Sequence, residues 1–355
     1  MPNSTLTAAI DALASGRDLG EEQTAGVLAE IMQGEASETQ IAGFLIALRT
    51  KGETVEELTG LARTMRSLAS PVRTERHDLL DTSGTGGGRI TFNVSTTAAL
   101  IAAGAGCAVA KHGNRSATSR SGSADLLEAL GARIDLGPDG VADCIEEAGF
   151  GFMFAPAHHQ ATRFVVPVRR ELAVRTIFNL LGPLTNPAGA RRQLIGVSEP
   201  GFLERIARTL ANLGVDRALV VSSLDGLDEI SSAAGTTVYE VNGEDIRRYE
   251  LDPGEVGIDS HAGRAATDGW AGGTPEENAR LTRAILDGGP GRERPAGEAL
   301  AVINAGAAIY AAGRADTIAQ GVEAAREALG DGSAAAALER YLQASRRHAP
   351  AEAAG

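Results

Sequence analysis

Apolar side chains recur every three or four positions along the first seventy residues, and short polar stretches separate four groups of them. This spacing puts the apolar residues on one face of a helix, so it predicts four short amphipathic helices. Residue pairs with capping chemistry stand at three of the expected starts: Asp18 with Glu21, Ser37 with Gln40, and Thr54 with Glu57. Gly34 and Gly52 stand at two of the expected helix ends.

From about residue 77 the pattern changes, because short apolar runs now alternate with helical stretches. The runs expected to be strands are HDLLDT, CAVAKHG, FGFMFAP, QLIGV and ALVVSS. Helices are expected between them, for example at 93–103, 123–130 and 202–213. A hairpin that turns near Asn242 and Gly243 is predicted for TTVYEVNGEDIRRYEL, and the pattern after residue 275 is helical again.

These patterns predict an α/β fold in two parts. A small helical domain is expected at 1–72, with a helical contribution from about 165–187. A larger α/β domain, with a central mostly parallel sheet flanked by helices, is expected at 77–345, followed by a tail at 346–355. Four short helices bury little apolar surface by themselves, so we expect the small domain to pack against the rest of the chain or a second copy.

The composition of the 355 residues is that of a globular protein, with 43% hydrophobic and 22% charged residues. The net charge of −13 argues against a general binder of nucleic acid or of membrane surfaces. The first residues lack the basic segment of a signal peptide, and no apolar run reaches the roughly 18–20 residues of a membrane span. Both cysteines, Cys107 and Cys144, have apolar neighbours, so we expect a cytoplasmic protein with buried, reduced thiols.

The stretch DTSGTGGGRITFNVST, residues 81–96, is unusual because glycine is costly to order on folding. It joins an expected strand to an expected helix, and its glycines are Gly84, Gly86, Gly87 and Gly88. Backbone N–H groups in such a turn, with polar Asn93, Ser95 and Thr96 at the helix start, form a site that favours an anion. A tight turn whose glycines serve only packing is the alternative.

The next expected strand ends in KHGNR, residues 111–115. In a parallel sheet this end lies beside the loop of the preceding strand, at the edge where ligands bind. The stretch brings together a point cation, an imidazole, an amide and a guanidinium, and two further polar residues follow; these residues are Lys111, His112, Asn114 and Arg115, then Arg120 and Ser123. Such a cluster suits the recognition of phosphate and hydroxyl groups. A polar surface loop is the alternative.

An acidic pair, Asp228 and Glu229, follows another expected strand. Adjacent carboxylates are hard oxygen ligands suited to Mg²⁺, which usually keeps waters and shares substrate phosphates. A solvated acidic pair on the surface is the alternative. The spacing of His, Cys and acidic residues does not indicate zinc.

Positive charge is concentrated between residues 160 and 192, where six arginines face one acid, Glu171. These arginines are Arg163, Arg169, Arg170, Arg175, Arg191 and Arg192. Arg169, on the inner face of an expected helix, offers a forked donor to a carboxylate. We expect Arg163, Arg191 and Arg192 to be solvated or structural.

The chain resembles the anthranilate phosphoribosyltransferase family of tryptophan biosynthesis in six motifs that span nearly its whole length. They are SGTGGG…TFNVST, AKHGNR, SGSADLLEALG, FAPAHH…PVRREL, RTIFNLLGPLTNP and DEIS. Two positions depart from the family's usual pattern, because Gly88 stands where Asp is usual and Gln160 where Pro is frequent. The resemblance implies a small helical domain hinged to a larger α/β domain, an active site in the cleft, and dimerisation through the small domains.

The resemblance also implies the substrates 5-phosphoribosyl-1-diphosphate and anthranilate, with Mg²⁺ as cofactor. Residues implied for the diphosphate sugar are Gly84, Thr85, Gly86, Gly87, Thr91, Asn93, Ser95, Thr96, Lys111 and Ser123, of which Lys111 and Ser123 are the implied catalytic residues. Those implied for anthranilate are Gly84, His112, Asn114, His159 and Arg169. Ser95, Asp228 and Glu229 are implied to hold the metal.

Two other functions remain as alternatives. One is a nucleoside phosphorylase, which shares the architecture but uses phosphate to release a base. The other is a non-catalytic relative that binds nucleic acid, although the negative charge argues against it. For the transferase, the amine of anthranilate is neutral at pH 7, so we expect catalysis by positioning and charge stabilisation and no strong base.

Overall fold

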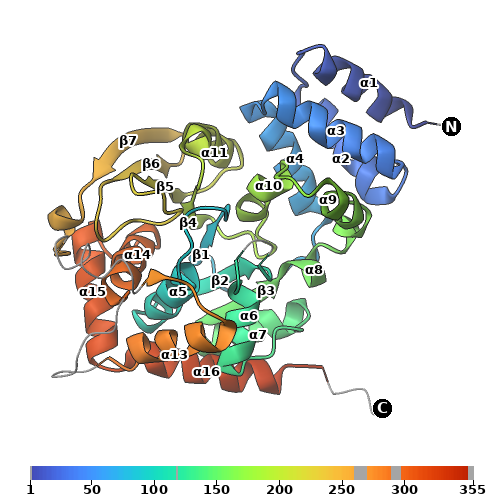
Figure 1. Cartoon of the computed structure of the whole chain (residues 1–355). Helices are drawn as coiled ribbons and strands as arrows, with labels where there is room; N and C mark the ends of the chain where they lie inside the picture. Colours follow the sequence, from blue (N-terminus) through green and yellow to red (C-terminus); the bar gives the residue numbers. More distant parts are fainter. Residues whose placement is uncertain (1, 117–118, 260–269, 289–296, 351–355) are drawn as a thin grey trace.

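The computed structural model describes residues 2–116, 119–259, 270–288 and 297–350, and it has a helical bundle at one end and an α/β part at the other (Figure 1). The bundle consists of α1 (Ser4–Ala14), α2 (Glu21–Gln33), α3 (Glu38–Lys51) and α4 (Val55–Leu68). The four predicted helices are therefore confirmed. None of the described helices combines the length and apolar character that crossing a bilayer requires.

The predicted helix ends are mostly observed, with one error. Thr54 and Glu57 form the predicted capping box at the start of α4. The capping box predicted for Asp18 and Glu21 is wrong, because Gly20 is the N-cap of α2 and its N–H binds the side chain of Gln23, at 2.9 Å.

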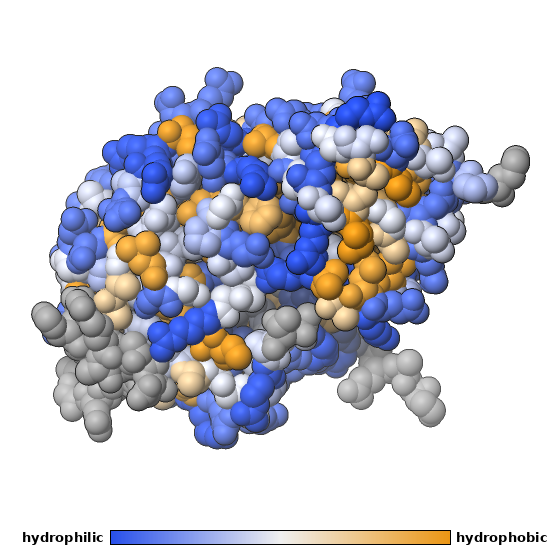
Figure 2. All heavy atoms as spheres, turned by 45° about the horizontal axis from the view of Figure 1, so that its top comes forward, coloured by the Kyte–Doolittle hydropathy of each residue, from blue (hydrophilic) through white to orange (hydrophobic). Residues whose placement is uncertain are grey.

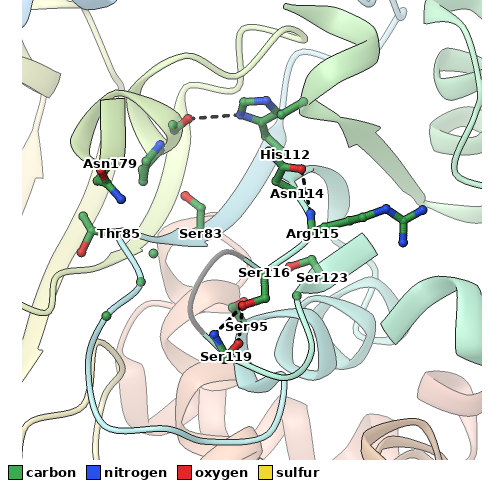
Figure 3. A pocket seen from close by; sticks show the side chains of 18 of the residues that line it. Ser83, Thr85, Ser95, His112, Asn114, Arg115, Ser116, Ser119, Ser123 and Asn179 are labelled. Carbon is green, nitrogen blue, oxygen red and sulfur yellow. Dashed lines mark hydrogen bonds between the residues drawn. The ribbon is translucent and has the colours of Figure 1, made fainter. Parts of the chain in front are cut away.

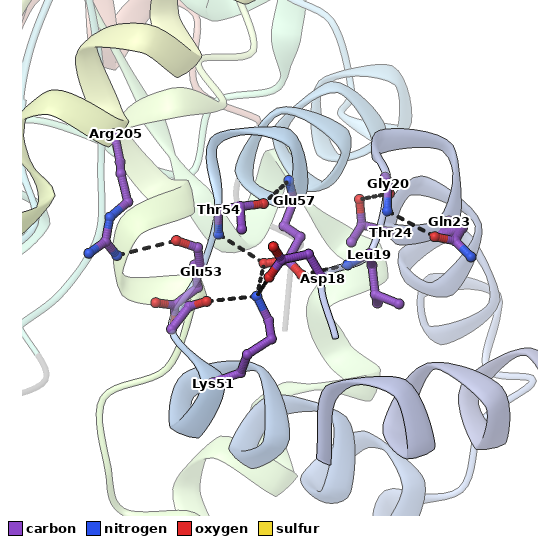
Figure 4. A network of polar contacts seen from close by, with 11 residues as sticks. Asp18, Leu19, Gly20, Gln23, Thr24, Lys51, Glu53, Thr54, Glu57 and Arg205 are labelled. Carbon is purple, nitrogen blue, oxygen red and sulfur yellow. Dashed lines mark hydrogen bonds and ion pairs between the residues drawn. The ribbon is translucent and has the colours of Figure 1, made fainter. Parts of the chain in front are cut away.

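Asp18 instead belongs to a polar network inside the bundle (Figure 4). The ammonium of Lys51 lies 2.6 Å from Asp18 Oδ1, 2.9 Å from Glu57 Oε2 and 2.8 Å from the carbonyl of Gly52. The fully buried Glu57 also accepts the N–H of Leu19, at 2.9 Å. Because a buried charge needs such partners, the network fixes how the α1–α2 loop meets the start of α4.

The α/β part contains a seven-stranded sheet in the order β3-β2-β1-β4-β5-β6-β7. Its strands are β1 (Leu79–Gly84), β2 (Ala108–Gly113), β3 (Phe150–Phe154), β4 (Arg192–Gly196), β5 (Arg217–Ser223), β6 (Thr236–Asn242) and β7 (Asp245–Leu251). The first five strands in this order pair in parallel, and β6 and β7 form the predicted antiparallel hairpin. The predicted fold class is confirmed.

Helices surround this sheet (Figure 1). They are α5 (Val94–Gly104), α6 (Ser123–Leu130), α7 (Pro138–Ala148), α11 (Leu203–Asn212), α13 (Pro275–Leu286), α14 (Glu298–Ala311), α15 (Ile318–Gly330) and α16 (Ser333–Arg347). Short 3₁₀ helices occur at Gln160–Phe164, Pro200–Phe202 and Pro253–Val256.

Between β3 and β4 the chain leaves the sheet and packs against the bundle through α8 (Ala155–His158), α9 (Val166–Leu172) and α10 (Phe178–Leu184). Buried residues of this segment, among them Val165 and Ile177, share one core with the bundle and with α11.

The two faces of the sheet belong to different cores. Leu219 and Val221 of β5 pack in the core that contains α5 and α14, whereas Ala218 and Val220 pack in the core shared with the bundle. Successive side chains of a strand point to opposite faces, so one strand supplies both cores. The bundle is thereby joined to the sheet through continuous apolar contact, which holds α8–α10 opposite the ends of β1 and β2.

Candidate active site

A cavity of about 1100 Å³ opens at the carboxyl ends of β1 and β2, between the α/β part and the α8–α10 segment (Figure 3). It brings together all but one of the predicted site residues. Those lining it are Gly84, Thr85, Gly86, Gly87, Thr91, Asn93, Ser95, Lys111, His112, Asn114, Ser123, His159, Arg169, Asp228 and Glu229. Thr96 is the exception, because its side chain is fully buried in α5.

The glycine loop follows β1 and has a conformation that only glycine adopts easily. Gly86 and Gly87 have φ angles of +64° and +85°, in the left-handed region. The N–H of Thr85 binds the carbonyl of Gly196, at 2.9 Å, and the N–H of Gly86 binds the Asp228 carboxylate. The loop is therefore tied to β4 and to the acidic pair.

Gly88, the departure from the family pattern, also lies close to the acidic pair. A Cβ at this position would stand 2.7 Å from Asp228 Oδ1 and 2.9 Å from its backbone nitrogen. Both separations are shorter than a van der Waals contact. The loop thus passes so near Asp228 that any larger residue at position 88 requires the loop to move.

The start of α5 supplies polar groups to the cavity. Asn93 binds Ser121 through both ends of its amide, at 3.0 Å each, and its oxygen also accepts from Asn278, at 2.8 Å. Its side chain therefore holds the loop before α6 in place. The N–H of Ser95, one residue into the helix, binds the Glu229 carboxylate.

Lys111 lies at the base of the cavity and is only 1% exposed. Its ammonium contacts the carbonyl and hydroxyl of Thr82 and lies 3.3 Å from Ser95 Oγ. Burial lowers the pKa of Lys111 to about 8, and the carboxylates of Asp81 and Glu229 oppose that shift. The side chain therefore changes charge close to physiological pH.

Arg115, from the same KHGNR stretch, is directed away from the cavity (Figure 3). Its guanidinium pairs with Asp125 and Glu128 of α6, at 2.8 Å and 2.5 Å. Of the two cations in KHGNR, Lys111 is the one whose ammonium lies between Thr82 of β1 and Glu229 of the acidic pair.

The acidic pair faces the cavity from the loop after β5. Burial raises the pKa of both carboxyls, and the charge of Asp228 raises that of Glu229 further. The loop is pinned to α14, because the buried amide of Asn304 exchanges two hydrogen bonds of 2.9 Å with the backbone of Ile230.

These two carboxylates fit a magnesium site completed by other oxygens. They are adjacent, half-buried and like-charged, and they border open space. Among the described residues no group of three or more His, Cys, Asp or Glu side chains forms a metal site. A divalent cation held here would take its remaining ligands from water and phosphate, as Mg²⁺ commonly does.

Two histidines line the opposite side of the cavity. His112 Nδ1 donates to the carbonyl of Gly182, at 3.1 Å, and its buried Nε2 finds no hydrogen-bond partner in the part of the chain that the structure describes. His159 Nε2 lies 3.1 Å from the carbonyl of Thr185, and the two rings are 5.1 Å apart. Burial lowers the pKa of His112 to about 3 and that of His159 to about 4. Both rings are therefore neutral at pH 7 and offer flat surfaces to an aromatic ligand.

Arg169 reaches the same side of the cavity from α9. Its guanidinium lies over the ring of Phe178, 5.5 Å from the centroid, and donates weakly to Asn179 Oδ1 at 3.5 Å. Asn179 is itself held by the N–H of Thr176, at 3.0 Å. Burial lowers the pKa of Arg169, a half-buried cation that has no carboxylate partner among the described residues.

Arg175, Asn179 and Ser198 are among the residues that contact the site or its loop but lay outside the predicted set. Arg175 and Asn179 line the cavity, and Ser198 binds the glycine loop. The signals for Arg175 were the excess of arginine between residues 160 and 192 and the RTIFNLLGPLTNP motif, to which Asn179 also belongs. Arg191 and Arg192, expected to be structural, pair with Asp216 and with the carbonyl of Ala312.

Comparison with known proteins supplies the class of the protein. A model of the glycosyl transferase family helical bundle domain matches residues 7–69, and a model of the a/b domain of the glycosyl transferase family matches residues 76–335. The fold is therefore that of the glycosyl transferase family, with a helical bundle domain and an a/b domain.

Individual relatives narrow this class. An anthranilate phosphoribosyltransferase of Rubrobacter xylanophilus is 52% identical over 96% of this chain and 98% of that protein. Another from Symbiobacterium thermophilum is 50% identical over 94% of this chain and 96% of that protein. The chain belongs to the anthranilate phosphoribosyltransferase family.

Solved structures agree with this family. The enzyme from Thermus thermophilus is 46% identical, with a TM-score of 0.87 over 95% of this chain and 99% of that chain. The enzyme from Saccharomyces cerevisiae, in complex with PRPP and Mg, is 27% identical, with a TM-score of 0.86 over 97% of this chain and 99% of that chain. The resemblance noted from the sequence motifs is confirmed.

Proposed function

We propose that this protein transfers the 5-phosphoribosyl group of 5-phosphoribosyl-1-diphosphate to the amine of anthranilate and releases pyrophosphate, a step of tryptophan biosynthesis. One observation supports this most directly. A single cavity has a glycine loop, a buried lysine and adjacent carboxylates on one side, and neutral histidines with the half-buried Arg169 on the other. The two sides match a charged diphosphate and an aromatic carboxylate.

On the diphosphate side, we assign binding to the glycine loop, Gly84 to Gly87, and to the polar groups around it. These groups are Thr91, Asn93, Ser95, Lys111 and Ser123, together with the backbone at Thr96 in the first turn of α5. The positive end of the α5 dipole favours the phosphates. Lys111 and Ser123 are the proposed catalytic residues, because both reach the position where the leaving pyrophosphate gathers charge.

Asp228 and Glu229, with Ser95, are the proposed magnesium-binding residues. Bound Mg²⁺ would neutralise part of the negative charge that develops on the leaving pyrophosphate. The residues of the chain perform the rest: they hold the diphosphate, and Lys111 stabilises the same charge.

On the acceptor side, Arg169 is proposed to bind the carboxylate of anthranilate, while Gly84, His112, Asn114 and His159 line its channel. The aniline nitrogen attacks ribose C1 as the C1–O bond to pyrophosphate breaks, and the nitrogen then loses a proton. Since the amine is neutral before attack, the neutral histidines need not remove that proton first. The rate enhancement comes from holding both reactants in line in a closed site.

We also propose the assembly and location of the protein. Domain limits of 1–72 and 77–345 and a homodimer formed through the helical bundle are proposals. Figure 2 shows apolar residues gathered over the bundle end of the molecule, where the exposed large apolar side chains are Ile46, Leu68, Val166 and Val174. A cytoplasmic location agrees with the buried free thiols of Cys107 and Cys144.

The test is the loss of anthranilate fluorescence on mixing the protein with 5-phosphoribosyl-1-diphosphate and Mg²⁺, with each component omitted in turn. We expect the signal to fall only in the complete mixture, with one pyrophosphate released per anthranilate consumed. Release of a free base from a nucleoside and phosphate, without loss of anthranilate, would establish a nucleoside phosphorylase instead.

A further inference from the structure

The side chain of Arg175 holds two carbonyl groups of the glycine loop. Its Nη1 donates to the carbonyl of Gly86 at 2.7 Å, and its Nη2 donates to the carbonyl of Thr85 at 3.3 Å. Gly87 lies directly against the guanidinium, because a Cβ there would stand 1.9 Å from Nη1. A side chain at position 87 would therefore displace the guanidinium, besides having to adopt a positive φ.

Holding these carbonyls fixes the direction of the next N–H groups. In a trans peptide the carbonyl of one residue and the N–H of the next point in opposite directions. The Arg175 guanidinium therefore turns the N–H groups of Gly86 and Gly87 to the side away from itself. Asp228, one of the proposed metal-binding residues, borders the same loop, because a Cβ at Gly88 would stand 2.7 Å from its Oδ1 and a Cβ at Gly84 3.1 Å from its Oδ2.

Arg175 is itself fixed from two other directions. Its Nε lies 3.2 Å from Glu199, and its backbone carbonyl accepts a hydrogen bond of 2.7 Å from Arg49 of α3. Ser198, beside Glu199, adds a hydrogen bond of 2.8 Å to the carbonyl of Gly86. The guanidinium thus has a defined place between the bundle, the start of the 3₁₀ helix after β4, and the loop.

We propose that Arg175 is a positioning residue that orients the Gly86 and Gly87 amides of the glycine loop toward the pyrophosphate group of the substrate. This inference rests on the proposed function, because it assigns the diphosphate to that loop. The proposed role of Arg175 depends on the forked shape of arginine, since its guanidinium donates to two carbonyls at once.

The experiment compares Arg175→Gln and Arg175→Lys by calorimetric titration with magnesium pyrophosphate and by steady-state kinetics. The matched control is Arg205→Gln. Arg205 of α11 also contacts the bundle, because it donates to the carbonyl of Glu53 at 3.2 Å (Figure 4). Unlike Arg175, it makes no hydrogen bond to the glycine loop among the described residues. Thermal melting of each variant checks that the fold is intact.

We expect both Arg175 variants to weaken pyrophosphate binding roughly tenfold to a hundredfold and to raise the KM for the diphosphate sugar to match. The KM for anthranilate should stay within about twofold of wild type. Lysine should not rescue, because it lacks the planar fork whose two separate nitrogens reach the carbonyls of Gly86 and Thr85 at the same time. Arg205→Gln should bind pyrophosphate as wild type does.

Four results would overturn the inference. Rescue by lysine would mean that only charge matters, and equal losses for both substrates would mean a general structural role. A loss in Arg205→Gln as large as in Arg175→Gln would assign the effect to the junction with the bundle. If wild type binds pyrophosphate and catalyses the transfer, and the Arg175 variants bind and catalyse as well as wild type does, the inference about Arg175 fails and the proposed function stands. If wild type binds neither pyrophosphate nor the diphosphate sugar, the proposed function fails.

Discussion

Lys111 shows how one buried residue can set the pH range of the whole site. Burial lowers its pKa to about 8, so its positive charge is lost as the pH rises through that value. On the acid side of the pH profile, the raised pKa values of Asp228 and Glu229 limit activity, because these carboxyls must lose protons before they bind a cation. We therefore expect kcat/KM for the diphosphate sugar to rise with pH on the acid side and to fall above about pH 8.

The alkaline limb of this profile can be assigned with Asp81→Asn. The carboxylate of Asp81 supports the charged form of Lys111 from inside the sheet, so its removal should move the limb to lower pH. A profile of kcat/KM between pH 5 and pH 10, with thermal melting as the check on folding, measures the shift. An unmoved limb would mean that another group controls it.

Arg169 belongs to the acceptor half of the site. Replacing it by alanine removes a charged hydrogen-bond donor worth about 1.5–3 kcal/mol, so the KM for anthranilate should rise roughly tenfold to a hundredfold while that for the diphosphate sugar changes little. Arg170→Ala is the control, since Arg170 is exposed on the same helix and lies outside the cavity. Equal effects on both KM values would remove the proposed carboxylate contact.

At the scale of elements, periodicity predicted most of the fold. Helix α6 runs from Ser123 to Leu130 as expected, and the hairpin turns at Gly243 and Glu244, one residue beyond the predicted position. The start of α2 was wrong because Lys51, more than thirty residues away, engages Asp18 and leaves the N-cap to Gly20. Local spacing cannot show a contact of this kind, since it forms only when the helices pack.

The loop after β5 makes an element-level prediction about the metal. Asn304 of α14 pins it, so changing the carboxylates should alter metal binding without moving the loop. Asp228→Asn with Glu229→Gln should raise the Mg²⁺ concentration for half-maximal rate and lower the maximal rate, measured by magnesium titration. Asp216→Asn, at an exposed ion pair with Arg191, should leave both unchanged. An unaltered magnesium profile in the double variant would place the metal elsewhere.

For the molecule as a whole, the sequence could predict which loops meet but not which side chains bridge them. Strand ends of a parallel sheet share an edge, and this rule placed Lys111 beside the glycine loop. Arg175 opens the RTIFNLLGPLTNP motif and bridges to Gly86 across 89 residues, but neither the motif nor the arginine-rich stretch shows which loop its guanidinium reaches. Arg115 likewise belongs to a motif, and its guanidinium points to α6.

The proposed dimer can be tested only with residues that the monomer leaves exposed. Phe44 and Leu45 of α3 are at most 1% exposed, so changing them would damage the core of the bundle and not an interface. Ile46, beside them, is 38% exposed, and a glutamate there would place a charge in any apolar contact between bundles.

We expect Ile46→Glu to sediment as a monomer at concentrations where wild type is a dimer, with an unchanged circular dichroism spectrum. Leu224→Glu, at a 65% exposed position far from the bundle in sequence, should still sediment as a dimer. If both variants sediment as wild type does, the bundle is not the interface, and the exposed apolar side chains around it have another cause.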